Sequence, residues 1–104
     1  MPSSEYDPIA WMQSQVGRDV GEIILEAQSA IAAAEWGTSG VKGAVAKREA
    51  GAVDFALSLK RLVFFLEFKT KPSGVTNSVW MVMRDIIQEL VDQGRLNPDT
   101  LDFF

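Results

Sequence analysis

The chain has 104 residues, of which 47% are hydrophobic and 23% are charged, and its formal net charge is −4. A chain this short holds one hydrophobic core, so we expect residues 1–104 to form a single helical domain, with residues 1–6 disordered. Cysteine and histidine are both absent. Their absence removes disulfides, thiolate nucleophiles, the usual general base near neutral pH and the commonest transition-metal ligands. We therefore expect neither an enzyme nor a cofactor or metal site.

The charge is unevenly distributed along the chain. Residues 1–41 carry a net charge of −5, residues 42–71 carry +4, and residues 72–104 carry −3. Opposite charges on neighbouring helices favour one pairing over others, so the pattern predicts a basic middle helix between acidic neighbours. The alternative is a nucleic-acid contact on this helix, although a pI of 4.7 is far from that of a typical phosphate binder. The candidate residues for that contact are Lys47, Arg48, Lys60 and Arg61.

The first predicted element is a helix over residues 8–36. Asp7 can cap its first turn, and Pro8 suits the first helical position because the backbone donor it lacks has no partner there. Apolar residues then recur at helical spacing as far as Gly37, which can end the helix in a left-handed conformation. Gly17 lowers the helix propensity, and the helix either continues through it or breaks there.

The second predicted element is a helix from Val41 to the residues before Pro72, because proline disfavours helix in the residue preceding it. If a four-residue turn at 37–40 joins it to the first helix, the two form a long antiparallel hairpin. The register of that hairpin brings three large apolar residues of the second helix to three of the first. These are Leu62, Phe65 and Phe68, opposite Val16, Met12 and Ile9.

A third helix and a short C-terminal helical turn complete the all-α prediction. Residues 79–93 have an apolar face at helical spacing, with a capping residue among Thr76, Asn77 and Ser78. Gly94 predicts a Schellman ending, with Leu96 packed on Leu90. Asn97 and Pro98 predict one more turn. Because the sequence ends on two phenylalanines, we expect this tail to dock on a hydrophobic surface of its own subunit or a partner's.

The segment from Leu62 to Phe68 is apolar on every side of a helix and needs cover in all directions. Phe64 lies on a different face from Leu62, Phe65 and Phe68 in the predicted hairpin, so its cover decides whether a second subunit is needed. We predict an interface between subunits in this region. Its candidate residues are Leu62, Phe64, Phe65, Phe68, Trp80, Phe103 and Phe104.

An alternative secondary structure fits the same segment. Residues 61–71 also alternate with the period of a strand, and residues 79–83 can form the second strand of a β-hairpin. This would make the fold α+β. The continuous helical stripe from Val41 favours the helix.

These observations favour a non-catalytic helical protein-binding module, such as an adaptor, inhibitor or small subunit, acting as a homo-oligomer, most simply a dimer. The alternative function is a small helical component of a nucleoprotein complex. No stretch approaches the roughly 20 apolar residues of a membrane-spanning helix. The acidic segment before Ile9 is unlike a signal peptide, so we expect a cytoplasmic protein with no membrane partner.

Overall fold

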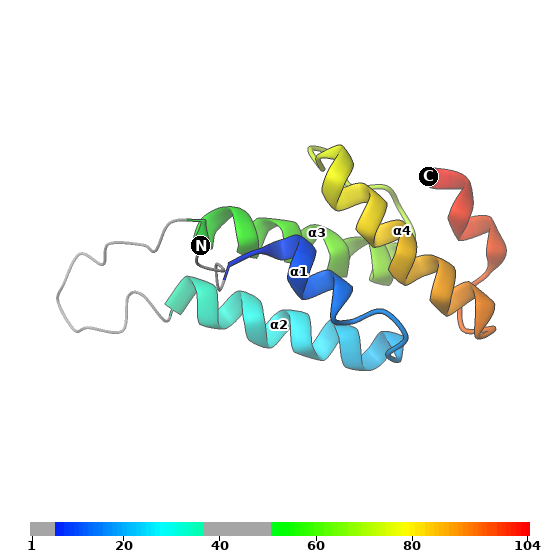
Figure 1. The fold of residues 1–104 in the computed structure, drawn as a ribbon, viewed down its shortest axis with the longest axis horizontal. Coiled ribbons are helices and arrows are strands. Elements are labelled where there is room, and N and C mark those ends of the chain that lie inside the picture. Colours follow the sequence, from blue (N-terminus) through cyan, green and yellow to red (C-terminus); the bar gives the residue numbers. More distant parts are fainter. Residues whose placement is uncertain (1–5, 37–50) are drawn as a thin grey trace, which may run out of the picture.

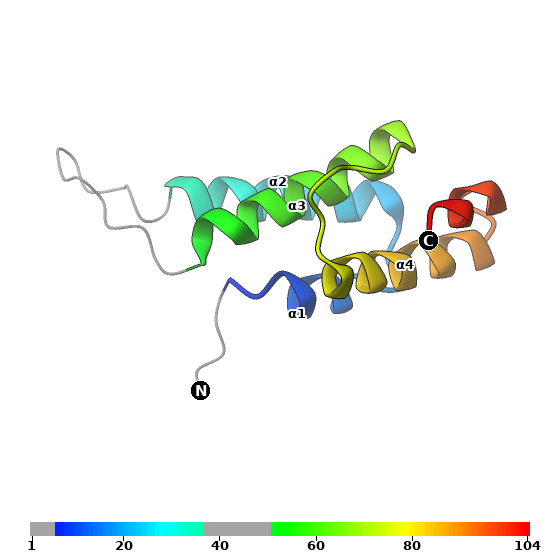
Figure 2. The same cartoon turned by 90° about the horizontal axis from the view of Figure 1, so that it is seen from above.

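The computed structural model describes residues 6–36 and 51–104. These residues form an all-α fold, which confirms the predicted fold class. Helices α2 and α3 lie side by side and antiparallel (Figure 1), and α1 and α4 form a second layer against them (Figure 2). In chain order the helices are α1 (Pro8–Gln13), α2 (Val20–Trp36), α3 (Ala52–Phe68), α4 (Asn77–Asp92) and the 3-10 helix η1 (Pro98–Phe103).

The β-hairpin alternative is wrong. Residues 61–68 lie in α3 and residues 79–83 lie in α4, so neither segment is a strand. The segment is helical because helical spacing places one set of its apolar residues in the core. Ala52, Phe55, Leu59, Leu62 and Leu66 are all buried there, and they recur at spacings of three and four.

The predicted helix over residues 8–36 is broken into α1 and α2, which lie in different layers of the fold. Gly17 has a φ of +91°, which is left-handed and outside the range of an α-helix. The buried Gln15 side chain donates to Ser14 Oγ at 3.1 Å and accepts from Arg18 Nη1 at 3.3 Å, so the turn satisfies its polar groups. Asp19 then caps α2, because its carboxylate accepts from the backbone N–H of Gly21.

The break changes which helices pack together. Instead of extending α2, α1 lies in the same layer as α4 (Figure 2). Asp7 Oδ1 accepts from the backbone N–H groups of Ile9 and Ala10, which confirms the predicted cap of α1. Met12 is fully buried in the core. Tyr6, expected to belong to a disordered segment, packs edge-on against Phe55 with ring centroids 5.6 Å apart.

The predicted hairpin register is also wrong. It assumed a turn at 37–40 and would place Lys60 opposite Gly17, whereas Lys60 faces Glu35 near the C-terminal end of α2. Helix α3 begins at Ala52, after Gly51 with a φ of +86°, so it does not run as one unbroken helix from Val41. The predicted helical segment 41–50 lies outside the described residues.

The last part of the chain has the helix ending and the helix caps that its sequence predicts. Gly94 has a φ of +78°, and the backbone N–H of Arg95 donates to Leu90 O at 2.8 Å, which confirms the predicted Schellman ending of α4. Thr76 is the residue that caps the start of α4. Asn97 caps η1 by accepting from the backbone N–H of Asp99. This geometry returns the last residues toward α3 and α4.

Candidate protein-binding surface

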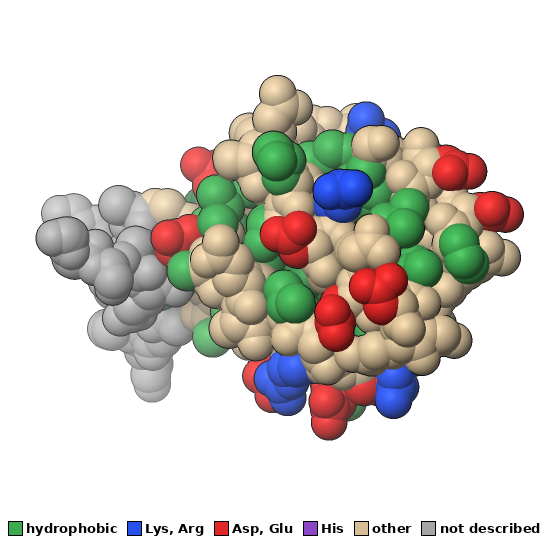
Figure 3. Space-filling model, turned by 45° about the vertical axis from the view of Figure 1, so that its right-hand side comes forward, with side chains coloured by type: hydrophobic (Ala, Val, Ile, Leu, Met, Phe, Trp, Pro, Cys, Tyr) green, Lys and Arg blue, Asp and Glu red, His purple; other side chains and the backbone are tan. Residues whose placement is uncertain are grey.

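Charged and hydrophobic side chains are interspersed on the face of the molecule drawn in Figure 3. Lysine and arginine side chains stand apart from one another on that face, with acidic side chains among them. A nucleic-acid surface requires basic side chains gathered in a patch or stripe. The face in Figure 3 has no such patch among the described residues.

Helix α3 carries two exposed phenylalanines, Phe64 and Phe68, which we call the aromatic ridge. Their exposed fractions are 41% and 63%. The two rings lie one helical turn apart along α3, with centroids separated by 5.0 Å and planes inclined by 49°. Large aromatic side chains grouped on a surface are typical of protein interaction sites.

Helical geometry explains why Phe64 is exposed while its neighbour Phe65 is buried. Successive residues of an α-helix point about 100° apart, so the positions of Leu62, Phe65 and Leu66 cluster on one side of α3 and Phe64 lies on the opposite side. Phe65 points inward and is fully buried, with Leu62 and Leu66 on the same side. The ridge continues toward the start of α3 through two further exposed apolar residues, Leu57 and Val53. This side of α3 therefore exposes four apolar residues to solvent, with the charged Lys60 among them.

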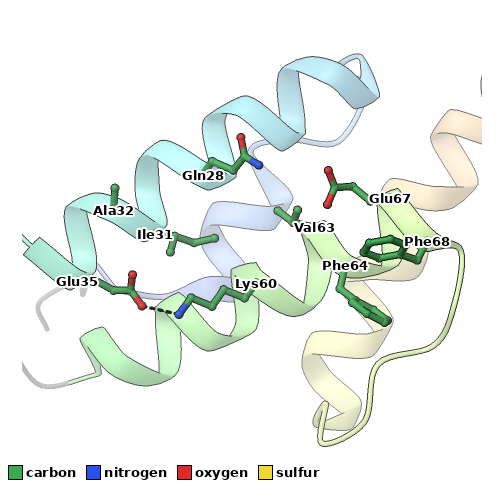
Figure 4. A pocket seen from close by; sticks show the side chains of 9 residues that line it. All are labelled: Gln28, Ile31, Ala32, Glu35, Lys60, Val63, Phe64, Glu67 and Phe68. Carbon is green, nitrogen blue, oxygen red and sulfur yellow. Dashed lines mark hydrogen bonds and ion pairs between the residues drawn. The ribbon is translucent and has the colours of Figure 1, made fainter.

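A hollow of about 420 Å³ lies between α2 and α3, on one side of the ridge. Ile31 of α2 and Val63 of α3 lie between the two helices in this hollow (Figure 4). Lys60 and Glu35 form an ion pair at one end, with Nζ 2.5 Å from Oε2, and Glu67 lies toward the other end. The remaining lining residues are Gln28, Ala32, Phe64 and Phe68.

A second hollow, of about 470 Å³, lies beside Phe64 where the chain leaves α3. It shares Lys60 and Phe64 with the first hollow. Its other lining residues are Arg61, Thr70, Lys71, Pro72 and Ser73. Phe64 therefore borders two depressions, which is a shape that a complementary protein surface can enter.

The basic side chains around the ridge each have a partner within the chain. Lys60 pairs with Glu35, and Arg61 Nη1 donates to Gly74 O at 3.0 Å. Lys69 Nζ donates to Leu66 O, and Lys71 Nζ lies 5.1 Å from the centroid of the Trp80 ring. Lys60, Arg61 and Lys71 thereby connect separate segments of the fold, whereas Lys69 bonds the end of its own helix. By contrast, Glu67 has no ion-pair partner among the residues that the structure describes.

The structure divides the predicted interface residues into two groups. Leu62 and Phe65 are fully buried in the core of their own chain. Trp80 and Phe104 stack on each other, with ring centroids 4.1 Å apart and planes inclined by 23°. Phe103 contacts Phe65 edge-on, with centroids 5.7 Å apart. The tail thus docks on its own chain, and the exposed part of the predicted interface consists of the aromatic ridge and Phe103.

Only two of the four candidate nucleic-acid contacts lie among the described residues. Lys60 and Arg61 lie on α3 with the intrachain partners given above. Lys47 and Arg48 lie outside the described residues. Lys60 and Arg61 line the second hollow together with Lys71, and the nucleic-acid contact stays a prediction.

The sequence-based prediction did not include the residues of α2 that line the first hollow. Gln28, Ile31, Ala32 and Glu35 form that side, and the wrong hairpin register put other residues opposite Phe64. The opposite charges of Glu35 and Lys60 are a sequence signal that favours the observed register.

The fold and the surface together define a small all-α protein with an exposed aromatic ridge on an antiparallel helix pair. Comparisons with protein-family models, with curated proteins and with solved structures find no match for this chain. None of the described helices combines the length and apolar character that crossing a membrane requires. Within residues 6–36 and 51–104, no three acidic side chains come close enough to hold a metal ion.

Proposed function

We propose that this chain is a non-catalytic, helical protein-binding module that acts as a homo-oligomer through the aromatic ridge. The observation that carries the proposal is the exposure of Phe64 and Phe68, at 41% and 63%, on a helix whose opposite side is fully buried. Burying a phenylalanine side chain is favourable by about 1.5–3 kcal/mol relative to leaving it exposed. A surface that covers both rings therefore gains substantial free energy.

The surroundings of the ridge support binding to a protein surface. The first hollow has an apolar floor at Ile31 and Val63, with charged groups at its ends. Such an arrangement, with an apolar centre and a polar rim, is characteristic of protein interfaces. The side chains that remain for catalysis in a sequence without histidine or cysteine are carboxylates, hydroxyls and amines. This composition also favours binding over catalysis.

Sedimentation equilibrium of the wild-type chain tests the proposal. We expect the measured mass to rise with concentration above the 11.5 kDa of one chain. The double variant Phe64→Ser/Phe68→Ser should stay at the mass of one chain over the same range, because it removes both aromatic rings.

Met81→Ser is the matched control. Met81 lies on α4, lines neither hollow and is 66% exposed, which is close to the exposure of Phe68. We expect this variant to associate like the wild type. A wild-type chain that stays monomeric at high micromolar concentration, or equal association of all three proteins, would contradict the proposal.

A further inference from the structure

We infer that the aromatic ridge binds the same ridge of a second copy, with the two α3 helices antiparallel and a two-fold axis passing near Phe64. This inference rests on the proposed function and specifies its partner and geometry. In a two-fold dimer the same patch is used by both subunits, so the patch must be complementary to itself. The distribution of charge along α3 has this property.

Lys60 and Glu67 lie on opposite sides of Phe64 in the sequence, four residues before it and three residues after it. Both residues line the first hollow, so they lie on the same flank of the ridge. A two-fold axis between antiparallel helices reverses the direction along the helix and keeps each flank on its own side. It therefore brings Lys60 of one copy opposite Glu67 of the other, and it does so twice.

The ion-pair status of these two residues fits this arrangement. Glu67 has no ion-pair partner among the described residues, and it is exposed. Lys60 is paired with Glu35, but half of its side chain is exposed, and an ammonium group has three donors. It can accept a second carboxylate without losing the first. The inferred dimer thus supplies Glu67 with a basic partner.

The apolar contacts follow from the same axis. Phe64 of one copy lies against Phe64 of the other, at the centre of the contact. Phe68, one turn later, lies opposite the turn that contains Lys60 and Arg61. A guanidinium group packs well against an aromatic face, and Arg61 is held in place by its hydrogen bond to Gly74 O. The centre is apolar and both ends carry complementary groups.

Two charge variants test the geometry. In Glu67→Lys, positions 60 and 67 are both basic. In Glu35→Lys/Lys60→Glu, both positions are acidic, and the ion pair between α2 and α3 is kept with its charges reversed. In either homodimer, like charges face each other twice across the axis, so we expect the dissociation constant of each to rise at least about tenfold. Circular dichroism and thermal melts check that both variants remain folded.

An equimolar mixture of the two variants gives the decisive result. Across the axis, each basic position then meets an acidic one, so we expect a heterodimer with an affinity within about threefold of the wild type. A tag on one variant allows the heterodimer to be separated and measured. The triple variant Glu35→Lys/Lys60→Glu/Glu67→Lys should likewise form a homodimer, because it exchanges both charges.

A second measurement does not depend on substitution. A zero-length carbodiimide joins lysines to carboxylates that are in contact. Lys60 and Glu67 of one chain are separated by about two helical turns, roughly 10 Å, which extended side chains can span. A dimer of one isotope-labelled and one unlabelled chain therefore shows which links join two copies. We expect mass spectrometry of that dimer to identify a link between Lys60 of one copy and Glu67 of the other.

The possible failures are distinguishable. If the wild type associates but the charge variants bind as it does and do not prefer each other, the antiparallel geometry is wrong while the proposed function stands. Covalent dimers that are linked only through residues other than Lys60 and Glu67 would likewise show that the antiparallel geometry is wrong. If the wild type is monomeric, both the geometry and the proposed homo-oligomer are wrong.

Discussion

Lys60 of α3 and Glu35 of α2 form an ion pair, with 2.5 Å between Nζ and Oε2, and this pair marks the register of the antiparallel helices. Half of the Lys60 side chain and 34% of the Glu35 side chain are exposed, so solvent screens the interaction. We expect a double-mutant cycle with Glu35→Gln and Lys60→Met to give a coupling free energy of about 0.2–1 kcal/mol. Urea unfolding at low protein concentration measures it, and a coupling free energy that destabilises the fold would contradict the observed register.

The local features of this fold were predictable from short sequence signals. Three local signals begin or end a helix at the predicted position. They are Asp7 before Pro8, Gly94 after the apolar face of α4, and Asn97 before Pro98. Caps and left-handed glycines depend on a few neighbouring residues, so a single sequence contains the information needed to predict them. The all-α class follows in the same way from helical spacing.

The relative placement of the helices could not be predicted as well. The register between α2 and α3 depends on the length of their connection, and the sequence between Trp36 and Ala52 also fits a short turn followed by more helix. The helical period predicted that Phe64 lies on a different face from Phe65. It did not predict the first hollow, because the residues of α2 that form it depend on the register.

Gly17 separates α1 from α2, and its φ of +91° predicts a specific cost of substitution. A Cβ atom at this position would meet nothing within 4 Å, so the effect comes from the backbone conformation alone. We expect Gly17→Ala to lower the free energy of unfolding by roughly 1–2 kcal/mol. Gly17→Asn should cost less, because asparagine tolerates the left-handed region. Equal stability of Gly17→Ala and the wild type in urea unfolding would contradict the observed break.

Phe65 and Phe64 are adjacent but should respond differently to truncation. Phe65 is fully buried against Trp80, Phe103 and Phe104, so Phe65→Ala should destabilise the chain by about 3–5 kcal/mol. Phe64 is 41% exposed, and Phe64→Ala should cost about 1 kcal/mol in the isolated chain.

The concentration dependence of these two effects separates core from interface. The stability of an associating protein rises with its concentration, because association stabilises the folded state. We expect Phe64→Ala to reduce this dependence of the melting temperature, whereas Phe65→Ala should lower the melting temperature at every concentration. Calorimetry at several concentrations makes the comparison, and the reverse assignment of the two effects would count against the aromatic ridge as an interface.

The stacked pair of Trp80 and Phe104 predicts that the tail contributes to stability. Phe104→Ala removes this stack and a contact with Phe65, so we expect a loss of about 1 kcal/mol or more in the free energy of unfolding. In a Trp11→Phe/Trp36→Phe background, the fluorescence of Trp80 should shift to longer wavelength on this substitution, because solvent reaches the indole. An unchanged spectrum would mean that the tail does not cover Trp80 in solution.

The inferred dimer places Phe64 of one copy in contact with the same surface of another. Isotope-filtered NMR on a mixture of labelled and unlabelled chains detects contacts between copies directly. We expect intermolecular nuclear Overhauser effects from the Phe64 ring to Phe64 and Phe68 of the second copy. Intermolecular effects confined to residues outside α3 would contradict this contact. The absence of any intermolecular effect, at concentrations where the wild type sediments as a dimer, would contradict it too.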